Sequence, residues 1–301
     1  MPVSVEEHTS TIPVVLLGST GSIGTQAREV IEAHRGRFDV IGVSAGGASI
    51  TELAAQIVAL RPAYVGVARD VREELAAAVE SMGGTCPEIF VGEDASVEVV
   101  CACVERAAQL YPSATPVVLN GITGGVGLSS TLAALKCGAR LALANKESLV
   151  VGGALVKNVM RFPGQIVPVD SEHSAIAQAL ASGVHERGLT SPVVSGRSEV
   201  ADLVLTASGG PFRGRSRDQL RGVRAEQALA HPTWQMGPVV TINSSTLINK
   251  GLELIEAHLL FDVAPEHIVA TVHPQSIVHS MVTWCDGATT LQASPPDMRL
   301  P

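Results

Sequence analysis

A strand–turn–helix pattern near the N-terminus constrains this sequence most. The apolar run Pro13–Leu17 leads into glycines at positions 18, 21 and 24, and a helical pattern follows from Thr25 to Ala33. Glycine lets the backbone approach a phosphate closely, and a helix N-terminus offers free N–H groups and a positive dipole end. An ordinary glycine turn would show the same glycines, so the motif alone is weak. Its position between a strand and a helix favours a dinucleotide-binding turn.

The alternation of strand and helix continues through the first half of the chain. We expect strands at residues 38–43, 63–67, 89–91, 116–119 and 140–143, with helices near 71–81 and 95–109. This rhythm predicts an α/β fold with a Rossmann-like, doubly wound parallel sheet. Pro163-Gly164 breaks it. We therefore expect a nucleotide-binding domain over residues 1–160 and an α+β catalytic domain over residues 161–301.

The second expected strand bears on the choice of nucleotide. It ends in Ser44-Ala-Gly-Gly-Ala-Ser49, which contains neither an acid nor a basic residue. An Asp or Glu at this place would bind a free ribose, whereas Arg or Lys would bind a 2′-phosphate. The missing acid favours NADP over NAD, and the missing base weakens that preference.

Two carboxylates follow the next apolar run. Residues 165–169 precede Asp170 and Glu172, which would point to one side if the strand continued through them. Acids so placed repel each other, and a divalent cation such as Mg²⁺ or Mn²⁺ would relieve the repulsion. The alternative is a solvated turn in which Ser171 or Asp170 caps a helix starting near Ser174. This stretch alone leaves both open.

A later helix brings together several polar groups. One of Ser244, Ser245 and Thr246 is expected to cap it, with Asn249 or Lys250 on the same face as Glu253. That face could grip a phosphate or polyol and supply a third metal-binding acid. The remaining assignments are a core-facing side made of Leu252, Ile255 and Leu259, and a solvated Glu256.

Three other segments can be interpreted either as ordinary structural features or as functional ones. Lys146-Glu147 at a strand-to-helix junction is often only a surface pair. The five arginines between Arg213 and Arg224 are typical of a solvated face. Residues 228–238 carry Trp234 in a Gly- and Pro-bounded loop, which indicates either a mobile lid or a Trp anchor.

Composition excludes several classes of protein. The formal net charge of -8 argues against a nucleic-acid partner, which would need a basic face. The apolar runs are too short to span a bilayer. The N-terminal segment is acidic, without the apolar core of a signal peptide, so we expect a cytoplasmic location. The five cysteines include no C-x-x-C pair and are expected to be reduced thiols.

Taken together, the motifs resemble those of the 1-deoxy-D-xylulose 5-phosphate reductoisomerase family. They occur in the family's order and span nearly the whole chain. The matching segments are Gly18-Ser-Thr-Gly-Ser-Ile-Gly24, Ala144-Asn-Lys-Glu147, Val169-Asp-Ser-Glu-His-Ser174, Ala207-Ser-Gly-Gly-Pro-Phe212, His231-Pro-Thr-Trp-Gln-Met-Gly237, Asn249-Lys-Gly-Leu-Glu253 and His273-Pro-Gln-Ser-Ile-Val-His-Ser-Met281.

The resemblance implies an enzyme of isoprenoid precursor biosynthesis by the non-mevalonate pathway. It would rearrange 1-deoxy-D-xylulose 5-phosphate and reduce the product with NADPH to 2-C-methyl-D-erythritol 4-phosphate, using Mg²⁺, Mn²⁺ or Co²⁺. It also implies a homodimer. The alternatives are a metal-independent NADP dehydrogenase and a non-catalytic NADP-binding remnant.

The resemblance assigns roles residue by residue. The metal ligands would be Asp170, Glu172 and Glu253, which with Lys146 and His231 form the catalytic set. The substrate would contact Lys146, Ser171, Glu172, Ser208, His231, Trp234, Ser244, Asn249, Lys250 and Glu253. NADPH would contact Thr20, Gly21, Ser22, Ile23, Gly46, Gly47, Ala48, Asn145, Glu147 and Gly237, with Met236 near the nicotinamide.

Two departures from the family pattern stand out. Gly47-Ala48 replaces a Lys-Asn pair that is common in the family, which bears on 2′-phosphate recognition. Family members normally continue past Asp297–Pro301 into a C-terminal helical domain, which we expect to be absent from these residues.

Overall fold

A computed structural model of the chain describes residues 11–230 and 237–301. The chain folds into two compact units. Unit 1 comprises Met1–Gly121 and Ala133–Leu141, and unit 2 comprises Ile122–Leu132 and Ala142–Pro301. Helix α5 and strand β6 each contribute residues to both units. The functional boundary expected near residue 160 stays a prediction.

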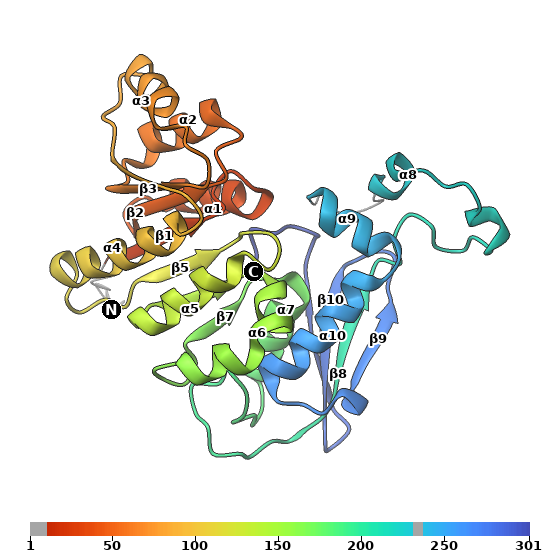
Figure 1. Ribbon diagram of the computed structural model, residues 1–301. Coiled ribbons are helices and arrows are strands. Elements are labelled where there is room, and N and C mark those ends of the chain that lie inside the picture. The colour runs from red at the N-terminus through yellow and green to blue at the C-terminus, as the bar shows by residue number, and fades with distance from the viewer. Residues whose placement is uncertain (1–10, 231–236) are drawn as a thin grey trace, which may run out of the picture. The chain divides into compact units, whose positions relative to one another are not determined.

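The parallel sheet predicted for the first half of the chain is present (Figure 1). Its strand order is β4-β3-β2-β1-β5-β6-β7, which confirms the doubly wound α/β class. The strands are β1 (Ile12–Leu17), β2 (Phe38–Ala45), β3 (Tyr64–Val67), β4 (Glu88–Val91), β5 (Val117–Asn120), β6 (Arg140–Leu143) and β7 (Ile166–Pro168). The helices along this part are α1 (Ser22–Ala33), α2 (Ile50–Leu60), α3 (Arg72–Ser81), α4 (Ala95–Leu110), α5 (Gly127–Cys137) and α6 (Lys146–Val159).

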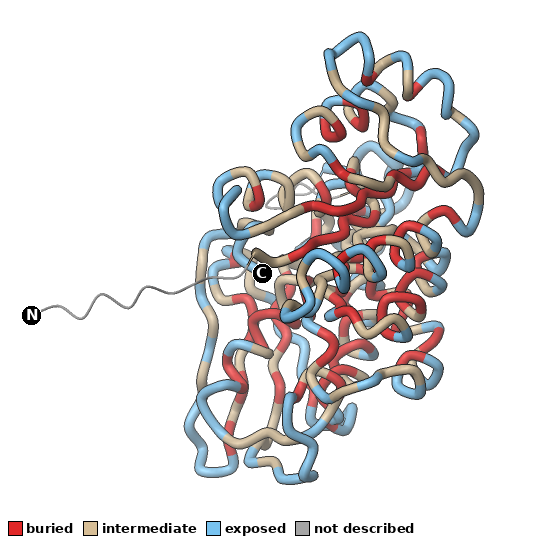
Figure 2. The backbone as a smooth tube through the Cα atoms, turned by 90° about the vertical axis from the view of Figure 1, so that its left-hand side faces the viewer, coloured by how far each residue is buried: buried red, intermediate tan, exposed pale blue. Residues whose placement is uncertain are grey.

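The central strands of unit 1 carry apolar side chains on both faces, and helices cover both faces of the sheet. In Figure 2 these strands run as nearly continuous buried segments. Their side chains join residues of α1, α2 and α3 in one core that includes Leu16, Val43, Leu53, Val65 and Leu75. Burial on both faces explains why the strands appear in the sequence as continuous apolar runs rather than alternating ones.

Unit 2 is built around a second, mixed sheet of order β11-β10-β8-β9. Strand β8 pairs antiparallel with β10 and parallel with β9, which is the α+β arrangement expected from the sequence. Its strands are β8 (Val200–Ala207), β9 (Ile268–Val272), β10 (Val278–Trp284) and β11 (Thr289–Ala293). Helix α7 (Ser171–Leu180) packs on β10 and β11.

The helices of unit 2 correct the expected position of a helix cap. Residues 244–246 do not cap the helix that carries Glu253, because Pro238–Ser245 is itself helix α9. Helix α10 (Ile248–Phe261) begins after Leu247, whose φ of 62° turns the chain between the two helices. Helix α8 spans Ala225–Leu229.

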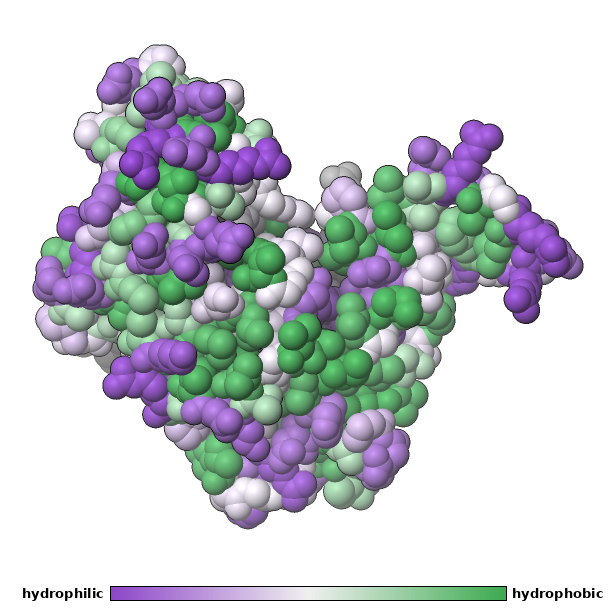
Figure 3. All heavy atoms as spheres, viewed as in Figure 1, coloured by the Kyte–Doolittle hydropathy of each residue, from purple (hydrophilic) through white to green (hydrophobic). Residues whose placement is uncertain are grey.

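Ile255 on α10 points towards solvent rather than into the core. It is 46% exposed, and Val151 and Leu155 of the neighbouring α6 are exposed as well. Figure 3 shows the apolar surface over these two helices. The residues of α10 that do fill the core are Ala257, Leu260 and Phe261.

None of the described helices combines the length and the hydropathy that a membrane span requires.

Candidate metal and substrate site

Asp170 and Glu172 lie at the start of helix α7 rather than on a strand. Strand β7 ends at Pro168, and Asp170 is the N-cap of α7, where its Oδ1 accepts a hydrogen bond from the Glu172 N–H at 3.3 Å. The strand-alternation argument for their common direction was therefore wrong. The two acids nevertheless lie close together because they flank the first turn of one helix. Asp170 caps a helix, as the alternative expected, but the helix begins at Ser171 rather than near Ser174, and the turn is mostly buried rather than solvated.

Glu253 joins the two acids from helix α10. One carboxylate oxygen from each of Asp170, Glu172 and Glu253 lies within 4.8 Å of the other two. Asn249 and Lys250 share the face of α10 that carries Glu253, as the three- and four-residue spacing predicted. The structure thus brings together all three acids proposed as metal ligands.

Two lysines bridge the carboxylates. Lys146 Nζ lies 2.7 Å from Asp170 Oδ2 and 2.9 Å from Glu253 Oε1, and also donates to Asn249 Oδ1 at 3.1 Å. Lys250 Nζ lies 3.1 Å from Glu172 Oε1 and forms an ion pair with Glu253 Oε2. Lys146 is only 6% exposed, so the interpretation of Lys146-Glu147 as a surface pair is wrong for the lysine.

The ion pairs determine the charge state of the cluster. Burial opposes the charge on Lys146, yet the carboxylates of Asp170 and Glu253 hold the pKa of its ammonium well above the ordinary value. Burial likewise opposes ionisation of Asp170 and Glu253, but Lys146 keeps the pKa of each carboxyl lowered. Glu172 differs: burial, with repulsion from Glu253 and Asp170, raises its pKa to about 7 despite Lys250.

The donor set suits a hard divalent cation. It offers carboxylate oxygens only, which are the ligands that Mg²⁺ and Mn²⁺ prefer. Glu253 Oε2 is buried and accepts no hydrogen bond, although it faces the Lys250 ammonium. When all three carboxylates are ionised, they outnumber the two lysine ammonium groups that bridge them. The residues present therefore fit the metal that the sequence predicted.

A buried histidine links the two helices that carry the acids. His173 Nε2 donates to the Glu253 carbonyl oxygen at 2.9 Å, and Nδ1 lies 3.3 Å from both Asp170 Oδ1 and Glu256 Oε2. Burial disfavours its charge, but Glu256 and Asp170 raise its pKa to about 9. Sequence reasoning gave His173 no role. The signal was present, because His173 follows Asp170 by three residues on a helix.

Glu256 is buried, contrary to the prediction that it is solvated. It is 2% exposed, and burial raises its pKa to about 7 against the influence of His173. Its three-residue spacing from Glu253 places it on the same side of α10. That spacing was visible in the sequence but was outweighed by the expectation that a second acid would face water.

The serines proposed to bind substrate also lie in unit 2. Ser171 Oγ donates to Glu172 Oε2 at 2.6 Å. Ser208 follows strand β8, where its hydroxyl accepts from the Gly210 N–H at 3.3 Å. A Cβ at Gly210 would lie 2.8 Å from the backbone oxygen of Ser244, so the Ser208 turn and the end of α9 are close neighbours.

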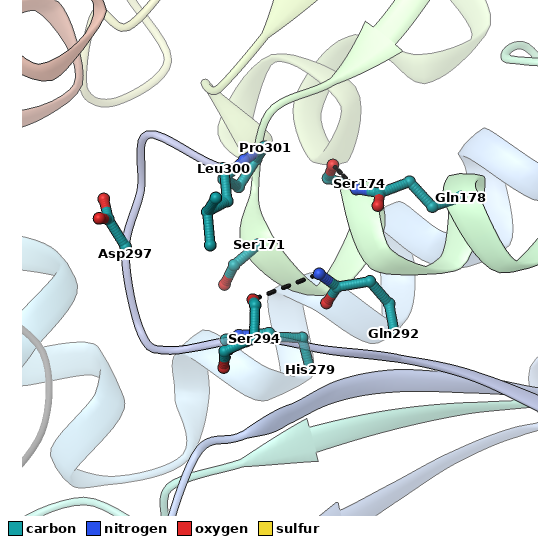
Figure 4. Close-up of a pocket in the computed structure, with 9 residues that line it drawn as sticks. All are labelled: Ser171, Ser174, Gln178, His279, Gln292, Ser294, Asp297, Leu300 and Pro301. Carbon is teal, nitrogen blue, oxygen red and sulfur yellow. Dashed lines mark hydrogen bonds between the residues drawn. The ribbon is translucent and has the colours of Figure 1, made fainter. Parts of the chain in front are cut away.

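A polar pocket adjoins Ser171. Figure 4 shows Ser171 and Ser174 of α7 facing side chains of β10, β11 and the segment that follows β11. Gln292 Nε2 donates to Ser294 Oγ at 3.2 Å, and Gln178 Nε2 donates to Ser174 Oγ at 3.1 Å. His279, which the sequence analysis assigned no role, is a further lining residue and is 5% exposed. Because the Ser171 hydroxyl contacts Glu172, this pocket borders the acid cluster.

Several of the proposed residues fall at the start of α9 or before it. His231, Trp234 and Met236 lie outside the described residues, as does most of the expected lid over residues 228–238. Gly237 is described and is the N-cap of helix α9. The five arginines from Arg213 to Arg224 are exposed, as a solvated face requires.

The glycine turn of unit 1 has the features needed to bind a phosphate. Gly18 has a φ of 73°, and a Cβ at Gly24 would lie 2.4 Å from the Ser19 carbonyl oxygen, so both positions require glycine. Helix α1 begins at Ser22 without a side-chain cap, which leaves its first-turn N–H groups available to a ligand. The proposed contacts Thr20, Gly21, Ser22 and Ile23 all lie in this turn.

The second proposed nucleotide segment lies beside the first. Strands β1 and β2 pair in parallel with Leu17 opposite Ser44, and the Ser19 N–H donates to the Ser44 carbonyl at 2.8 Å. Gly46, Gly47 and Ala48 follow β2, so they occupy the same edge of the sheet as the glycine turn. Ligands of such sheets bind at the carboxyl ends of the strands.

Asn145 and Glu147 lie at the start of helix α6 in unit 2. Asn145 is the N-cap: its Oδ1 accepts from the Ser148 N–H at 2.7 Å, and its Nδ2 donates to the Gly124 carbonyl at 2.8 Å. The side chain therefore orders the helix start and the glycine-rich loop. A contact of Asn145 with a cofactor stays a prediction.

A nucleotide-type sheet and a three-carboxylate site together define a class: α/β enzymes that combine a dinucleotide with a divalent cation. Residues 14–153 match the family model described as 1-deoxy-D-xylulose 5-phosphate reductoisomerase, and residues 166–261 match the model of its C-terminal domain. The chain belongs to the 1-deoxy-D-xylulose 5-phosphate reductoisomerase family.

Curated relatives extend the match over almost the whole chain. The reductoisomerase of Beutenbergia cavernae is 59% identical over 96% of this chain and 67% of its own length. That of Kitasatospora griseola is 55% identical over 96% of this chain and 69% of its own length. The chain thus spans about two thirds of these relatives.

Solved structures of reductoisomerases are also similar to this chain. A DOX-P reductoisomerase in complex with NADPH, fosmidomycin and magnesium superposes with a TM-score of 0.80 at 32% identity, covering 95% of this chain and 67% of that one. The Zymomonas mobilis enzyme in complex with NADPH gives 0.78 at 35% identity, covering 96% of this chain and 69% of that one.

Proposed function

We propose that this chain is the NADPH- and divalent-metal-dependent enzyme that converts 1-deoxy-D-xylulose 5-phosphate to 2-C-methyl-D-erythritol 4-phosphate. The observation that carries the proposal is the cluster of Asp170, Glu172 and the buried Glu253, bridged by two lysines. Family membership and the similarity to complexes containing NADPH and magnesium support it. A metal-independent dehydrogenase would have no use for three converging acids.

The cation would be held by the three carboxylates of this cluster. When bound, a divalent ion acts as a Lewis acid towards a ketone and a neighbouring hydroxyl, which facilitates C–C bond rearrangement. Lys146, Asn249 and Lys250 lie beside the carboxylates and offer cationic and amide donors to an anionic, hydroxylated substrate. Ser171, Ser208 and Ser244 add hydroxyls from the same unit, and His231 and Trp234 complete the proposed substrate set.

NADPH would bind at the carboxyl edge of the unit 1 sheet. The turn from Thr20 to Ile23 offers backbone N–H groups to the pyrophosphate, and Gly46–Ala48 lies beside it. The segment after β2 lacks an acid that would repel a 2′-phosphate, so we expect NADPH to bind more tightly than NADH. Equal dissociation constants for the two nucleotides would contradict this assignment.

We propose that nucleotide binding and catalysis belong to different parts of the chain, divided near residue 160. We assign nucleotide binding to residues 1–160 and catalysis to residues 161–301, in line with the separate family matches over 14–153 and 166–261. The homodimer and the cytoplasmic location implied by the resemblance remain predictions, and light scattering of the purified chain tests the former.

The decisive experiment measures NADPH consumption with 1-deoxy-D-xylulose 5-phosphate, with and without Mn²⁺, for the parent chain and Glu253→Gln. Gln keeps the shape of the side chain but removes one anionic ligand, so we expect turnover to fall by at least two orders of magnitude. NADPH affinity should stay within about twofold, because unit 1 holds the nucleotide turn. Glu266→Gln, the same change at an exposed position, is the matched control.

The outcomes separate the candidate functions. Turnover that needs no divalent cation would favour a metal-independent dehydrogenase. Tight NADPH binding without any turnover would favour a non-catalytic nucleotide-binding remnant. Parallel loss of NADPH affinity in Glu253→Gln would refute the assignment of separate roles to the two parts.

A further inference from the structure

We propose that Gln56 is a positioning residue for the nucleotide turn, which comprises residues 18–24. Its side-chain amide holds the peptide group between Ser19 and Thr20 in the orientation that directs the Thr20 N–H at the cofactor. The inference rests on the nucleotide-binding part of the proposed function, since the turn is assigned to NADPH. Gln56 lies on helix α2, and sequence reasoning assigned it no role.

Gln56 reaches the turn through one hydrogen bond that spans 37 residues of sequence. Its Nε2 donates to the Ser19 carbonyl oxygen at 2.9 Å, and both residues are buried. A carbonyl oxygen can only accept, so the amide nitrogen rather than the amide oxygen must face Ser19. Among the described residues, no other donor reaches this carbonyl. Gln56 therefore satisfies a buried backbone group of the turn.

The other end of the same amide argues against a role in packing alone. Gln56 Oε1 is buried and accepts no hydrogen bond from the described residues. An unpaired buried acceptor destabilises a folded chain, and an apolar side chain of similar length would avoid that penalty. The neighbouring residues Leu53, Ala54 and Ile57 of α2 are apolar and belong to the core of unit 1. The bond to Ser19 is therefore the reason for a polar residue at this position.

The bond to Ser19 determines where the next N–H points. The Ser19 carbonyl and the Thr20 N–H belong to one planar trans peptide group, so they point in opposite directions. With the carbonyl directed at Gln56, the Thr20 N–H is directed away from it, and no acceptor among the described residues takes this N–H. The N–H of Ser19 itself donates to the Ser44 carbonyl at 2.8 Å. The peptide groups on both sides of Ser19 are thereby fixed.

The start of helix α1 packs directly against this peptide group. A Cβ at Gly24 would lie 2.4 Å from the Ser19 carbonyl oxygen, which leaves little room for another arrangement. Helix α1 begins at Ser22 without a side-chain cap, so its first N–H groups can bind the same anion as the Thr20 N–H. Such a site binds a phosphate when its N–H groups point at one place. Gln56 sets the direction of one of these donors from outside the turn.

Gln56→Met keeps the length of the side chain and removes the donor. The Ser19 carbonyl would then be buried without a partner, and rotation of its peptide group would relieve this penalty while turning the Thr20 N–H away from the pyrophosphate. We expect the dissociation constant for NADPH to rise about tenfold, the effect of losing roughly one hydrogen bond. The dissociation constant for NADH should rise by the same factor, because both nucleotides carry the same pyrophosphate.

The experiment measures the dissociation constants of NADPH and NADH by nicotinamide fluorescence, together with thermal unfolding, on the whole chain. Leu53→Ala is the control for lost stability. It opens a cavity one turn earlier on α2, so it should lower the melting temperature and leave both dissociation constants unchanged. Gln109→Met makes the same chemical change at an exposed position of α4 and should alter neither property.

A second variant tests the donor itself. In Gln56→Glu the carboxyl can donate to the Ser19 carbonyl only while it is protonated, and an ionised carboxylate would repel that carbonyl. The ratio of its NADPH dissociation constant to that of the parent should therefore increase as the pH rises from about 5.5 to about 8. Gln56→Met should show no such trend, because methionine does not titrate. Gln56→Glu also serves if Gln56→Met does not fold.

An unchanged NADPH dissociation constant in Gln56→Met, with a melting temperature lowered as in Leu53→Ala, would show a packing role and overturn the inference. A loss of affinity for NADPH but not for NADH would also overturn it, because the effect would then lie at the 2′-phosphate. Failure of the proposed function is a different result. A parent chain that binds NADPH but does not consume it with 1-deoxy-D-xylulose 5-phosphate would refute the function alone, and a parent that binds no nucleotide would refute both.

Discussion

Lys146 would compete with the proposed cation for oxygens of Asp170 and Glu253, so replacing it tests the geometry of the site directly. Its ammonium lies within 3 Å of oxygens of both Asp170 and Glu253, at 2.7 and 2.9 Å. Lys146→Met keeps the length of the side chain and removes the charge. Of the two lysines that bridge the three carboxylates, Lys250 alone would remain. We expect a less stable metal-free chain, tighter binding of Mn²⁺, and loss of turnover.

The magnitudes follow from burial. Removing one partner of a buried ion pair costs roughly 3–5 kcal/mol, because the remaining charge is left without compensation. At about 2–4 °C for each kcal/mol, the metal-free variant should melt roughly 6–20 °C below the parent. Mn²⁺ at a hundredfold excess over its dissociation constant should restore about 2.7 kcal/mol. Loss of the competing ammonium should tighten Mn²⁺ binding about tenfold, which corresponds to ~1.4 kcal/mol.

The assay is thermal unfolding with a chelator and with Mn²⁺, together with a Mn²⁺ titration and a turnover measurement. Lys157→Met removes the same charge from an exposed position on the same helix and serves as the control. The reasoning is refuted if metal-free Lys146→Met melts with the parent, or if Mn²⁺ binds it more weakly. If Lys146→Met binds Mn²⁺ more tightly but no longer turns over, Lys146 is needed for the substrate and not for holding the cation.

Two further predictions concern stability. Burial raises the pKa values of Glu172 and Glu256 from 4.5 to about 7, so the folded chain binds more protons than the unfolded one, and stability should fall as the pH rises from 4.5 to 7. Melting temperatures measured in the presence of a chelator should fall over this pH range, and Mg²⁺ should make the fall smaller. A melting temperature that rises with pH would contradict the prediction. Separately, the sulfurs of Cys101 and Cys137 lie 3.7 Å apart across 36 residues, so a small-molecule disulfide should oxidise them to an intramolecular bond worth on the order of 3–4 kcal/mol. Peptide mass spectrometry should find that bond in the parent and not in Cys101→Ser.

The nucleotide-type sheet was predictable because its signal is local. Apolar runs, glycines and helical periods each lie within about a dozen residues, and parallel strands buried on both faces leave little ambiguity. Gly18 and Gly24 are clear examples. One needs a positive φ and the other has no room for a Cβ, so the sequence pattern reports the backbone geometry itself.

The acid cluster was predicted correctly for a partly wrong reason. The sequence suggested that Asp170 and Glu172 alternate along a strand, whereas Asp170 caps a helix and Glu172 lies in its first turn. Both geometries bring two carboxylates near one point, so the prediction survived the error. The cap at residues 244–246 did not survive, because a separate helix ends there and a left-handed Leu247 starts the next one.

What the sequence could not supply is the degree of burial of charged side chains. Lys and Glu side chains are most often exposed and solvated, so exposure is the ordinary expectation for Lys146 and Glu256. Their spacing along one helix cannot show that other elements of the fold bury them. Burial of a charge requires a partner, and the partners here are far away in sequence: Lys146 meets Glu253 across 107 residues. His173 illustrates the same limit. Its contacts with Asp170 and Glu256 become visible only when α7 and α10 are packed together, and that packing turns an unassigned histidine into the link between two proposed metal ligands.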